Sequence, residues 1–221
     1  MDDIRQFSSV DKDFDSKLQK LLDWQKTENS KIDHQVGEIL TNIRQKGDIA
    51  LLEYTNQFDN SNVSSIRDLI VSYDQMSQAL QNISEPERSA LNVSAKRIIE
   101  YHEHQKIDSW NYCDEDGTIL GQQVTPLDRV GIYVPGGKAD YPSSVLMNAL
   151  PAKVAGVNKI IMTAPAPDGQ LSPMVLAAAA IAGVDEIYTV GGAQAIGALA
   201  YGTNTIKKVD KIVGPGNIFV A

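Results

Sequence analysis

Three glycine-rich stretches carry the residue types that could bind a ligand. They read VPGGKADYPSS (134–144), VGGAQA (190–195) and VGPGN (213–217), and each comes at the end of a short apolar run. Because glycine has no Cβ, the backbone at Gly136 and Gly137 can approach a phosphate closely. Strand-to-helix turns also use glycine for steric reasons alone. The pattern predicts a ligand-binding crevice for a phosphate or nucleotide and specifies the ligand no further.

The polar side chains of the first stretch leave two interpretations open. Lys138 and Asp140 could contact a ligand electrostatically or belong to a solvated loop. Ser143 and Ser144 are most simply an N-cap pair for the helix that follows, with a ligand role as the alternative.

The sequence lacks a strict dinucleotide-binding fingerprint. The motif G-x-G-x-x-G does not occur, since GPGNIF has Phe219 where the third glycine would stand. No acidic residue lies about 20 residues after Gly137 to hold a ribose.

Other reactive side chains predict no catalytic or metal site. His102 and His104 lie two apart on an expected helix and so on different faces, which favours a solvated surface pair. His34 is expected at the surface as well. Cys113 has no histidine nearby in sequence, and no Cys/His/Asp cluster has the spacing of a zinc site. We therefore expect no catalytic residue and no metal ligand in this chain.

The elements that would position the loops follow from the apolar pattern of residues 126–221. The runs RVGIYV, KIIMTA, EIYTV and KIVG alternate with alanine-rich helical segments. Continuous apolar runs joined by helices predict a parallel sheet with helices on both faces, whose ligands bind beyond the carboxyl ends of the strands. Gly156, Gly183 and Gly202 are expected in left-handed conformations at the helix ends.

Helical spacing dominates the first hundred residues, with apolar stripes over 14–22 and 32–43. After Gly47 a helix resumes, with Asp48 as its expected N-cap. Residues 68–73 predict a short strand, after which Asp74 can cap the next helix.

Residues 84–87, Ser-Glu-Pro-Glu, predict a capping box that opens a long helix towards His104. A hairpin is expected over 110–114 and 118–124, turning at Asp116-Gly117.

Charge and glycine content change near Pro126. Residues 1–125 hold 13 Lys+Arg against 22 Asp+Glu and 4 glycines, whereas residues 126–221 hold 7 against 6 and 12 glycines. We predict an α/β protein: a mainly helical part with a β-hairpin over 1–125, then an incomplete Rossmann-like parallel sheet flanked by helices over 126–221.

The composition excludes several classes of partner. The net charge of −8 comes without a basic stripe, which argues against nucleic-acid binding. No apolar run approaches the length of a membrane span, and the amino terminus has no apolar signal region. A single cysteine suits a reducing compartment, so we expect a soluble cytoplasmic protein.

Three stretches together resemble the histidinol dehydrogenase family: GIYVPGGKADYPSSVLMNALPAKVAGV, VGGAQAIGALAYGT and VDKIVGPGNIFVA. The resemblance covers the whole chain in order, and the family's chain is roughly twice as long. It implies that residues 1–125 are the first piece of a domain completed later in the chain, and that 126–221 form a Rossmann-like NAD-side domain.

The resemblance also implies chemistry. The family oxidises L-histidinol through histidinal to L-histidine with NAD and zinc, in histidine biosynthesis, as a homodimer. Its cofactor contacts correspond to Tyr133, Gln194 and Asn217, and all three residue types match. Gly136 and Gly137 accompany them as backbone contacts. The family's zinc ligands and catalytic Glu-His pair fall beyond Ala221.

We therefore expect the amino-terminal portion of an NAD- and zinc-dependent histidinol dehydrogenase, inactive by itself but able to bind NAD weakly. Two alternatives remain: a non-catalytic nucleotide-binding module, and an aldehyde-dehydrogenase-like oxidoreductase. The second is disfavoured because Cys113 is a poor candidate for its thiol nucleophile.

Overall fold

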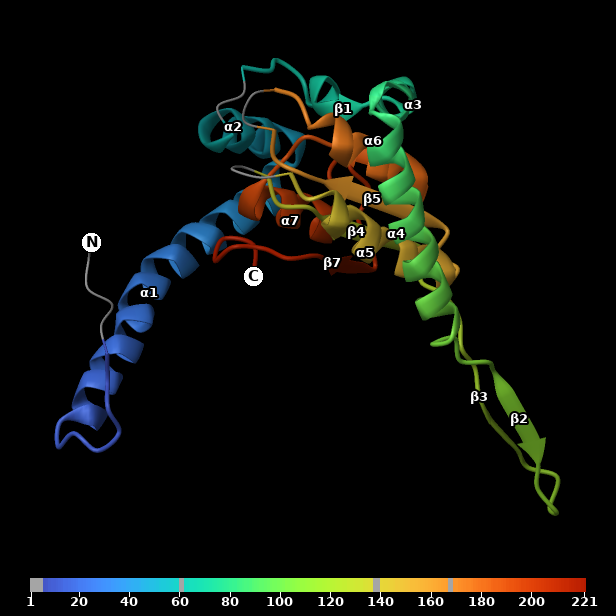
Figure 1. The fold of residues 1–221 in the computed structure, drawn as a ribbon, viewed down its shortest axis with the longest axis horizontal. Helices are drawn as coiled ribbons and strands as arrows, with labels where there is room; N and C mark the ends of the chain where they lie inside the picture. Colours follow the sequence, from blue (N-terminus) through green and yellow to red (C-terminus); the bar gives the residue numbers. More distant parts are fainter. Residues whose placement is uncertain (1–5, 60–61, 137–139, 167–168) are drawn as a thin grey trace. The chain divides into compact units, whose positions relative to one another are not determined.

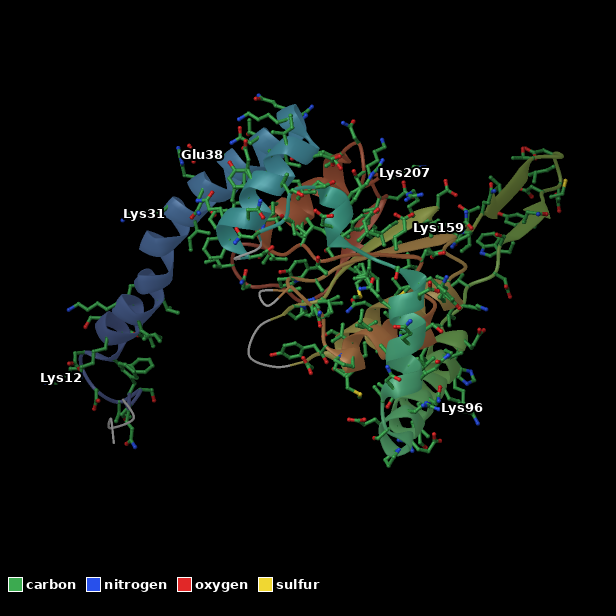
Figure 2. The ribbon with its side chains drawn as sticks, turned by 90° about the horizontal axis from the view of Figure 1, so that it is seen from above. Lys12, Lys31, Glu38, Lys96, Lys159 and Lys207 are labelled. Atoms are coloured by element: carbon green, nitrogen blue, oxygen red, sulfur yellow. The ribbon has the colours of Figure 1, made fainter. Side chains whose placement is uncertain are left out.

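The computed structural model of the protein describes residues 6–59, 62–136, 140–166 and 169–221, with side chains for all of these except residues 23–30. The chain divides into two compact units, Met1–Glu38 and Ile39–Ala221. Glu38, at the end of the first unit, is labelled in Figure 2.

Helix α1 (Phe14–Lys46) supplies the regular structure of the first unit and continues into the second. Both predicted apolar stripes lie on this one continuous helix. Near its start, Lys17 Nζ lies 2.9 Å from Asp13 Oδ2, one helical turn away.

A five-stranded mixed sheet forms the centre of the second unit (Figure 1), in the order β1-β6-β5-β4-β7. Strands β4, β5, β6 and β7 are parallel to one another, with Tyr133 opposite Thr163 and Thr163 opposite Tyr188. The parallel sheet predicted from the apolar runs is confirmed. The bounds of the parallel strands are β4 (Arg129–Tyr133), β5 (Lys159–Thr163), β6 (Glu186–Tyr188) and β7 (Lys211–Val213).

Helices cover both faces of this sheet. One face packs its apolar residues, such as Ile132 and Met162, against four helices to form the main core. These helices are α3 (Tyr73–Asn82), α4 (Glu85–Glu103), α5 (Pro142–Val154) and α6 (Pro173–Ala182). The other face carries α7 (Gly192–Tyr201), which packs with α2 (Asp48–Phe58). At the amino edge of the sheet, Nζ of Lys159, which Figure 2 labels, donates to Asp185 Oδ1 at 3.0 Å.

The short strand predicted over 68–73 is shorter than expected. A 3-10 helix, η1 (Ile66–Leu69), precedes a two-residue strand β1 (Ile70–Val71), which pairs antiparallel with β6. Because Ser65 and Asp68 cap η1 reciprocally, Asp68 and Leu69 belong to that turn instead of the strand.

Two of the predicted N-caps are wrong. Gly47, with φ 55°, forms the turn before α2, so Asp48 is already the first helical residue and accepts hydrogen bonds from Thr205. At α3 the cap is Ser72, whose Oγ accepts from Gln75 N at 3.2 Å while Gln75 Oε1 accepts from Ser72 N at 2.8 Å. This reciprocal box leaves no capping role for Asp74.

The capping box at α4 is confirmed. Ser84 Oγ accepts from Glu87 N, and Glu87 Oε2 accepts from Ser84 N at 2.9 Å. The helix then continues to Glu103, past Lys96, which Figure 2 labels.

The predicted hairpin is also confirmed, as β2 (Trp110–Cys113) paired antiparallel with β3 (Ile119–Gln122). Gly117 in its turn has φ 86°, a value that glycine adopts without the steric cost of a Cβ. All eight strand residues are exposed.

The glycines at the helix ends differ among themselves. Gly183 is a left-handed C-cap of α6, and Gly156 has φ 85° just after α5. Gly202 has a positive φ of 78° but ψ 157°, so it turns the chain away from α7 without adopting the expected left-handed helical conformation. Among the described residues, no helix combines the length and apolar character that a membrane span requires.

Candidate functional site

The loops that follow the parallel strands meet at the carboxyl edge of the sheet, with Pro165 between two of them. A Cβ placed on Gly136 would lie 2.5 Å from the carbonyl oxygen of Pro165. A Cβ placed on Gly191 would lie 2.5 Å from Cβ of Pro165. Real Cβ atoms do not come so close, so both positions require glycine for this packing.

The third loop joins the same edge through its first glycine. Gly214, at φ 133°, lies against the backbone of Tyr133, where a side chain would collide with the Tyr133 carbonyl oxygen. The three predicted glycine-rich stretches therefore converge, although Gly137 and Lys138 of the first stretch lie outside the described residues.

Tyr133 links the end of β4 to the start of α7. It is 4% exposed, and its hydroxyl accepts a hydrogen bond from Gly192 N at 3.2 Å. Burial raises the pKa of the Tyr133 phenol above its ordinary value, and the charge of Asp59 adds to this effect. The hydroxyl is thus neutral at physiological pH and held at the first turn of a helix.

Gln194 lies in that first turn and is 1% exposed. Its Nε2 has no hydrogen-bond partner among the described residues. A buried amide donor without a partner is uncommon, because leaving it unpaired costs about 1–3 kcal/mol. The amide nevertheless lies close enough to the Asp59 carboxyl to lower the pKa of that group, so Asp59 is a polar neighbour of this donor.

Asp59 is the residue that sequence reasoning missed. It follows α2 and is 9% exposed, and its Oδ2 accepts a hydrogen bond from Gly191 N at 3.0 Å. Burial raises the pKa of its carboxyl, while the Gly191 amide and the nearby Gln194 amide act in the opposite direction. No local signal in the sequence marks this contact, since it joins residues 132 positions apart.

Asn217 lies apart from this buried group. It is exposed, and its Oδ1 accepts from Phe219 N at 3.0 Å within the C-terminal turn. The structure thus brings Tyr133 and Gln194 together around Gly192, and Asn217 makes only local contacts among those described.

The serines of the first stretch do not cap α5. The N-cap is Tyr141, without a side-chain hydrogen bond, and Ser143 and Ser144 lie in the first turn of the helix. Pro142 sets the first helical φ and places the helix start before the serines, so the expectation of an N-cap pair is wrong. Asp140 is exposed.

The histidines and the cysteine stay at the surface, as expected. His34 and His104 are exposed, and His102 Nδ1 lies 2.6 Å from Gln105 Oε1. Cys113 is a free, exposed thiol. In the described part of the chain, no group of His, Cys, Asp and Glu could hold a metal ion.

A second cavity, mainly apolar and of 690 Å³, is lined by parts of α5, the end of α4 and the segments on either side of the hairpin. Val213, the first residue of the third stretch, also lines it, together with Val130 and Lys211 of the sheet. The ligand site rests on the glycine contacts and on the buried Gln194 amide.

Comparison with known proteins gives the same family that the motifs resemble. Residues 22–221 match the family model described as histidinol dehydrogenase. Histidinol dehydrogenase of Pseudomonas syringae pv. syringae (strain B728a) is 53% identical over 218 residues, which are 99% of this chain and 49% of that protein. The enzyme of Hydrogenovibrio crunogenus is 54% identical, with 99% and 50% covered.

A solved structure agrees in fold. The crystal structure of histidinol dehydrogenase from Elizabethkingia anophelis superposes with a TM-score of 0.79 at 35% identity, covering 86% of this chain and 43% of that one. The chain spans about half the length of the curated relatives it matches.

Proposed function

The chain belongs to the histidinol dehydrogenase family, and from that membership we propose that it is the amino-terminal half of an NAD- and zinc-dependent histidinol dehydrogenase. The complete enzyme would oxidise L-histidinol through histidinal to L-histidine, as a cytoplasmic homodimer. The observation that carries the proposal is the match of 99% of the chain at 53% identity, which includes the glycine-rich loops.

The described residues fit NAD at the carboxyl edge of the sheet. Gln194 Nε2 would donate to a cofactor oxygen, because it is a buried amide at this edge that makes no direct hydrogen bond among the described residues. A charged neighbour of this amide is the Asp59 carboxyl. Gly136 would let the backbone approach the cofactor, and Asn217 offers an exposed amide. Gly137 also belongs to the proposed NAD site, because of its position in the glycine-rich motif. NAD, when bound, supplies the acceptor for hydride from the substrate carbon.

Tyr133 would act in this site by holding the start of α7, since its hydroxyl already accepts from Gly192 N. A direct contact with the cofactor would need the ring edge to become accessible from its present 4% exposure. Its raised pKa keeps it neutral, so it would serve as a hydrogen-bonding group and not as a base.

The described residues do not fit zinc. No group of possible ligands comes together among them, so no catalytic step is assigned to a metal held by this half. We propose that the zinc ligands and the acid-base residues belong to the half of the family's chain that this sequence does not span. Residues 1–125 would then begin a domain that the second half completes, and 126–221 would be the NAD-side domain.

Two assays on this chain test the proposal. Incubated with L-histidinol, NAD and zinc, it should produce NADH only at background, because the proposal assigns the acid-base and zinc-binding groups to the half that this sequence does not span. Turnover within the usual enzymatic range, about 1–1000 per second, would contradict this.

Cofactor binding is tested by thermal unfolding. If NAD binds, a hundredfold excess over Kd should stabilise the fold by about 2.7 kcal/mol, and Gln194→Ala or Asn217→Ala should remove the shift. His34→Ala, at an exposed position of the first unit, is the control that should keep it. A shift that both loop variants retain would place NAD elsewhere.

A further inference from the structure

The start of helix α7 is already occupied by a negatively charged side chain. The first amide of the turn, Gly191 N, donates to Asp59 Oδ2 at 3.0 Å. The other carboxylate oxygen is also close, since a Cβ on Gly191 would lie 3.1 Å from Asp59 Oδ1. The next amide, Gly192 N, donates to the Tyr133 hydroxyl. Asp59, which follows α2, and Tyr133 of β4 therefore take the amides of the N-cap and of the first residue of a ten-residue helix.

A helix start with free amides is a common place for phosphate groups, because its N–H groups and the helix dipole attract anions. At α7 the Asp59 carboxylate, a group of the protein itself, accepts from the N-cap amide and places a negative charge at the positive end of the helix dipole. It is 9% exposed, so solvent screens its charge poorly. A phosphate at the same turn would lose the Gly191 amide and would face a like charge.

We propose that Asp59 is an internal anion that fills the phosphate position at the start of α7, fixing the Gly191–Gly192 turn and directing the diphosphate of a bound cofactor away from it. Asp59 is in this sense a positioning residue. The cofactor part of the inference rests on the proposed NAD site, whereas the anion role of Asp59 does not.

The part of a bound cofactor that contacts the start of α7 would then be an uncharged hydrogen-bond acceptor. Gln194 Nε2 is a neutral donor, buried to 1% exposure, that makes no direct hydrogen bond among the described residues but lies near the Asp59 carboxyl. Thr163 Oγ1, on the same face of the sheet as Tyr133, is likewise buried without a described partner. A neutral amide next to Asp59 and a buried hydroxyl opposite Tyr133 suit a carboxamide or a sugar hydroxyl better than a phosphate.

Amide NMR of the ¹⁵N-labelled chain tests the anion role directly. In the wild type, inorganic phosphate or formate at about 50 mM should leave the Gly191 resonance in place, because the carboxylate fills the site. Asp59→Ala should raise the hydrogen-exchange rate of Gly191 about tenfold or more, the loss expected for one charged hydrogen bond. Formate or phosphate should then restore protection to that amide.

Two further variants separate positioning from general stability. Asp59→Asn keeps an acceptor oxygen, so Gly191 should stay protected and insensitive to added anion. Asp210→Ala is the matched control, because Asp210 Oδ2 accepts from a backbone amide, Arg129 N, at 2.8 Å on the opposite edge of the sheet. That variant should leave Gly191 unchanged.

The proposal is overturned if phosphate shifts Gly191 in the wild type as strongly as in Asp59→Ala, or if Asp59→Ala leaves Gly191 exchange unaltered. Should the alanine variant not fold, Asp59→Asn decides: the wild-type Gly191 resonance should shift with pH as Asp59 titrates, and this pH dependence should vanish in Asp59→Asn. Its persistence there would refute the contact. Titration with NAD answers a different question. Absence of any NAD response would remove the cofactor assignment while leaving the Gly191 result standing.

Discussion

Gly131, in the middle of β4, lies where helix α7 packs directly on the sheet. A Cβ at this position would lie 3.0 Å and 3.1 Å from the two Cδ atoms of Leu199 and 3.1 Å from Val209 Cγ2. Leu199 is fully buried. The contact matters for the site because Tyr133 lies two residues beyond Gly131 and Gln194 lies on the same helix as Leu199.

We predict that Gly131→Ala and Leu199→Ala each destabilise the protein and that their effects partly cancel when combined. Adding a methyl group to this packed contact should cost about 1–3 kcal/mol of unfolding free energy. Truncating a fully buried leucine should cost about 2–5 kcal/mol, through lost burial and the cavity left behind. In the double variant the new methyl group enters the space that Leu199 vacated.

The combined loss should therefore fall short of the sum by about 1 kcal/mol or more, within the range of coupling found for residues in contact. Urea unfolding followed by circular dichroism measures it, with the slope m checked for constancy across the variants. The matched control pairs Gly131→Ala with Leu91→Ala, which removes a buried leucine from α4, a helix of the other face. The losses of unfolding free energy in that control pair should be additive to within about 0.5 kcal/mol. Equal additivity in both pairs would refute the close contact between β4 and α7.

Three further predictions concern the candidate site. Gln194→Met removes the buried amide at similar length, so any NAD-induced melting shift should disappear and the pKa of Asp59, which this amide lowers, should rise; a retained melting shift would exclude Gln194 from the cofactor site. Gly192→Ala should lower the urea midpoint by the equivalent of about 1–2 kcal/mol, because φ is 61° and the new Cβ would lie 2.7 Å from Gln194 Oε1; a midpoint equal to the wild type would show that the turn adapts. Burial raises the folded-state pKa of Asp59, so the wild type should lose stability as pH rises from about 3.9, the ordinary carboxyl value, through that raised pKa. Asp59→Asn lacks this loss, and its stability relative to the wild type should grow over the same window in thermal melts from about pH 4 to 8; a difference independent of pH would refute the shift.

Much of the architecture follows from local sequence signals. The apolar runs from Arg129 onwards predict the parallel strands because strands buried on both faces need no polar alternation. The Ser84–Glu87 box and the Asp116-Gly117 turn are likewise local, since each depends on residues at most four apart.

The errors arise where contacts distant in sequence decide the local structure. Strand β1 is held by β6, more than a hundred residues later, and no pattern within 68–73 announces its length. Asp48 looks like an N-cap but bonds Thr205, 157 residues away, because Gly47 makes the turn by itself. The Asp59 contact with Gly191 is of the same kind, and it is the part of the candidate site that motifs do not predict.

The distribution of buried polar groups supports the site independently of the family resemblance. Among the described residues, the buried polar or charged side chains are Thr55, Asp59, Thr163 and Gln194. Asp59 and Gln194 meet at the start of α7, Thr55 lies one turn before Asp59 on α2, and Thr163 ends β5 beside Tyr133. Three of these four carry a side-chain atom without a described partner, although each such atom costs stability. Other buried atoms without a described partner belong to the partly exposed Arg88 and Arg129, away from this edge. The fully buried polar side chains nevertheless include Gln194 and Thr163 at the edge where a parallel sheet binds its ligands, which is the arrangement expected if a ligand completes them.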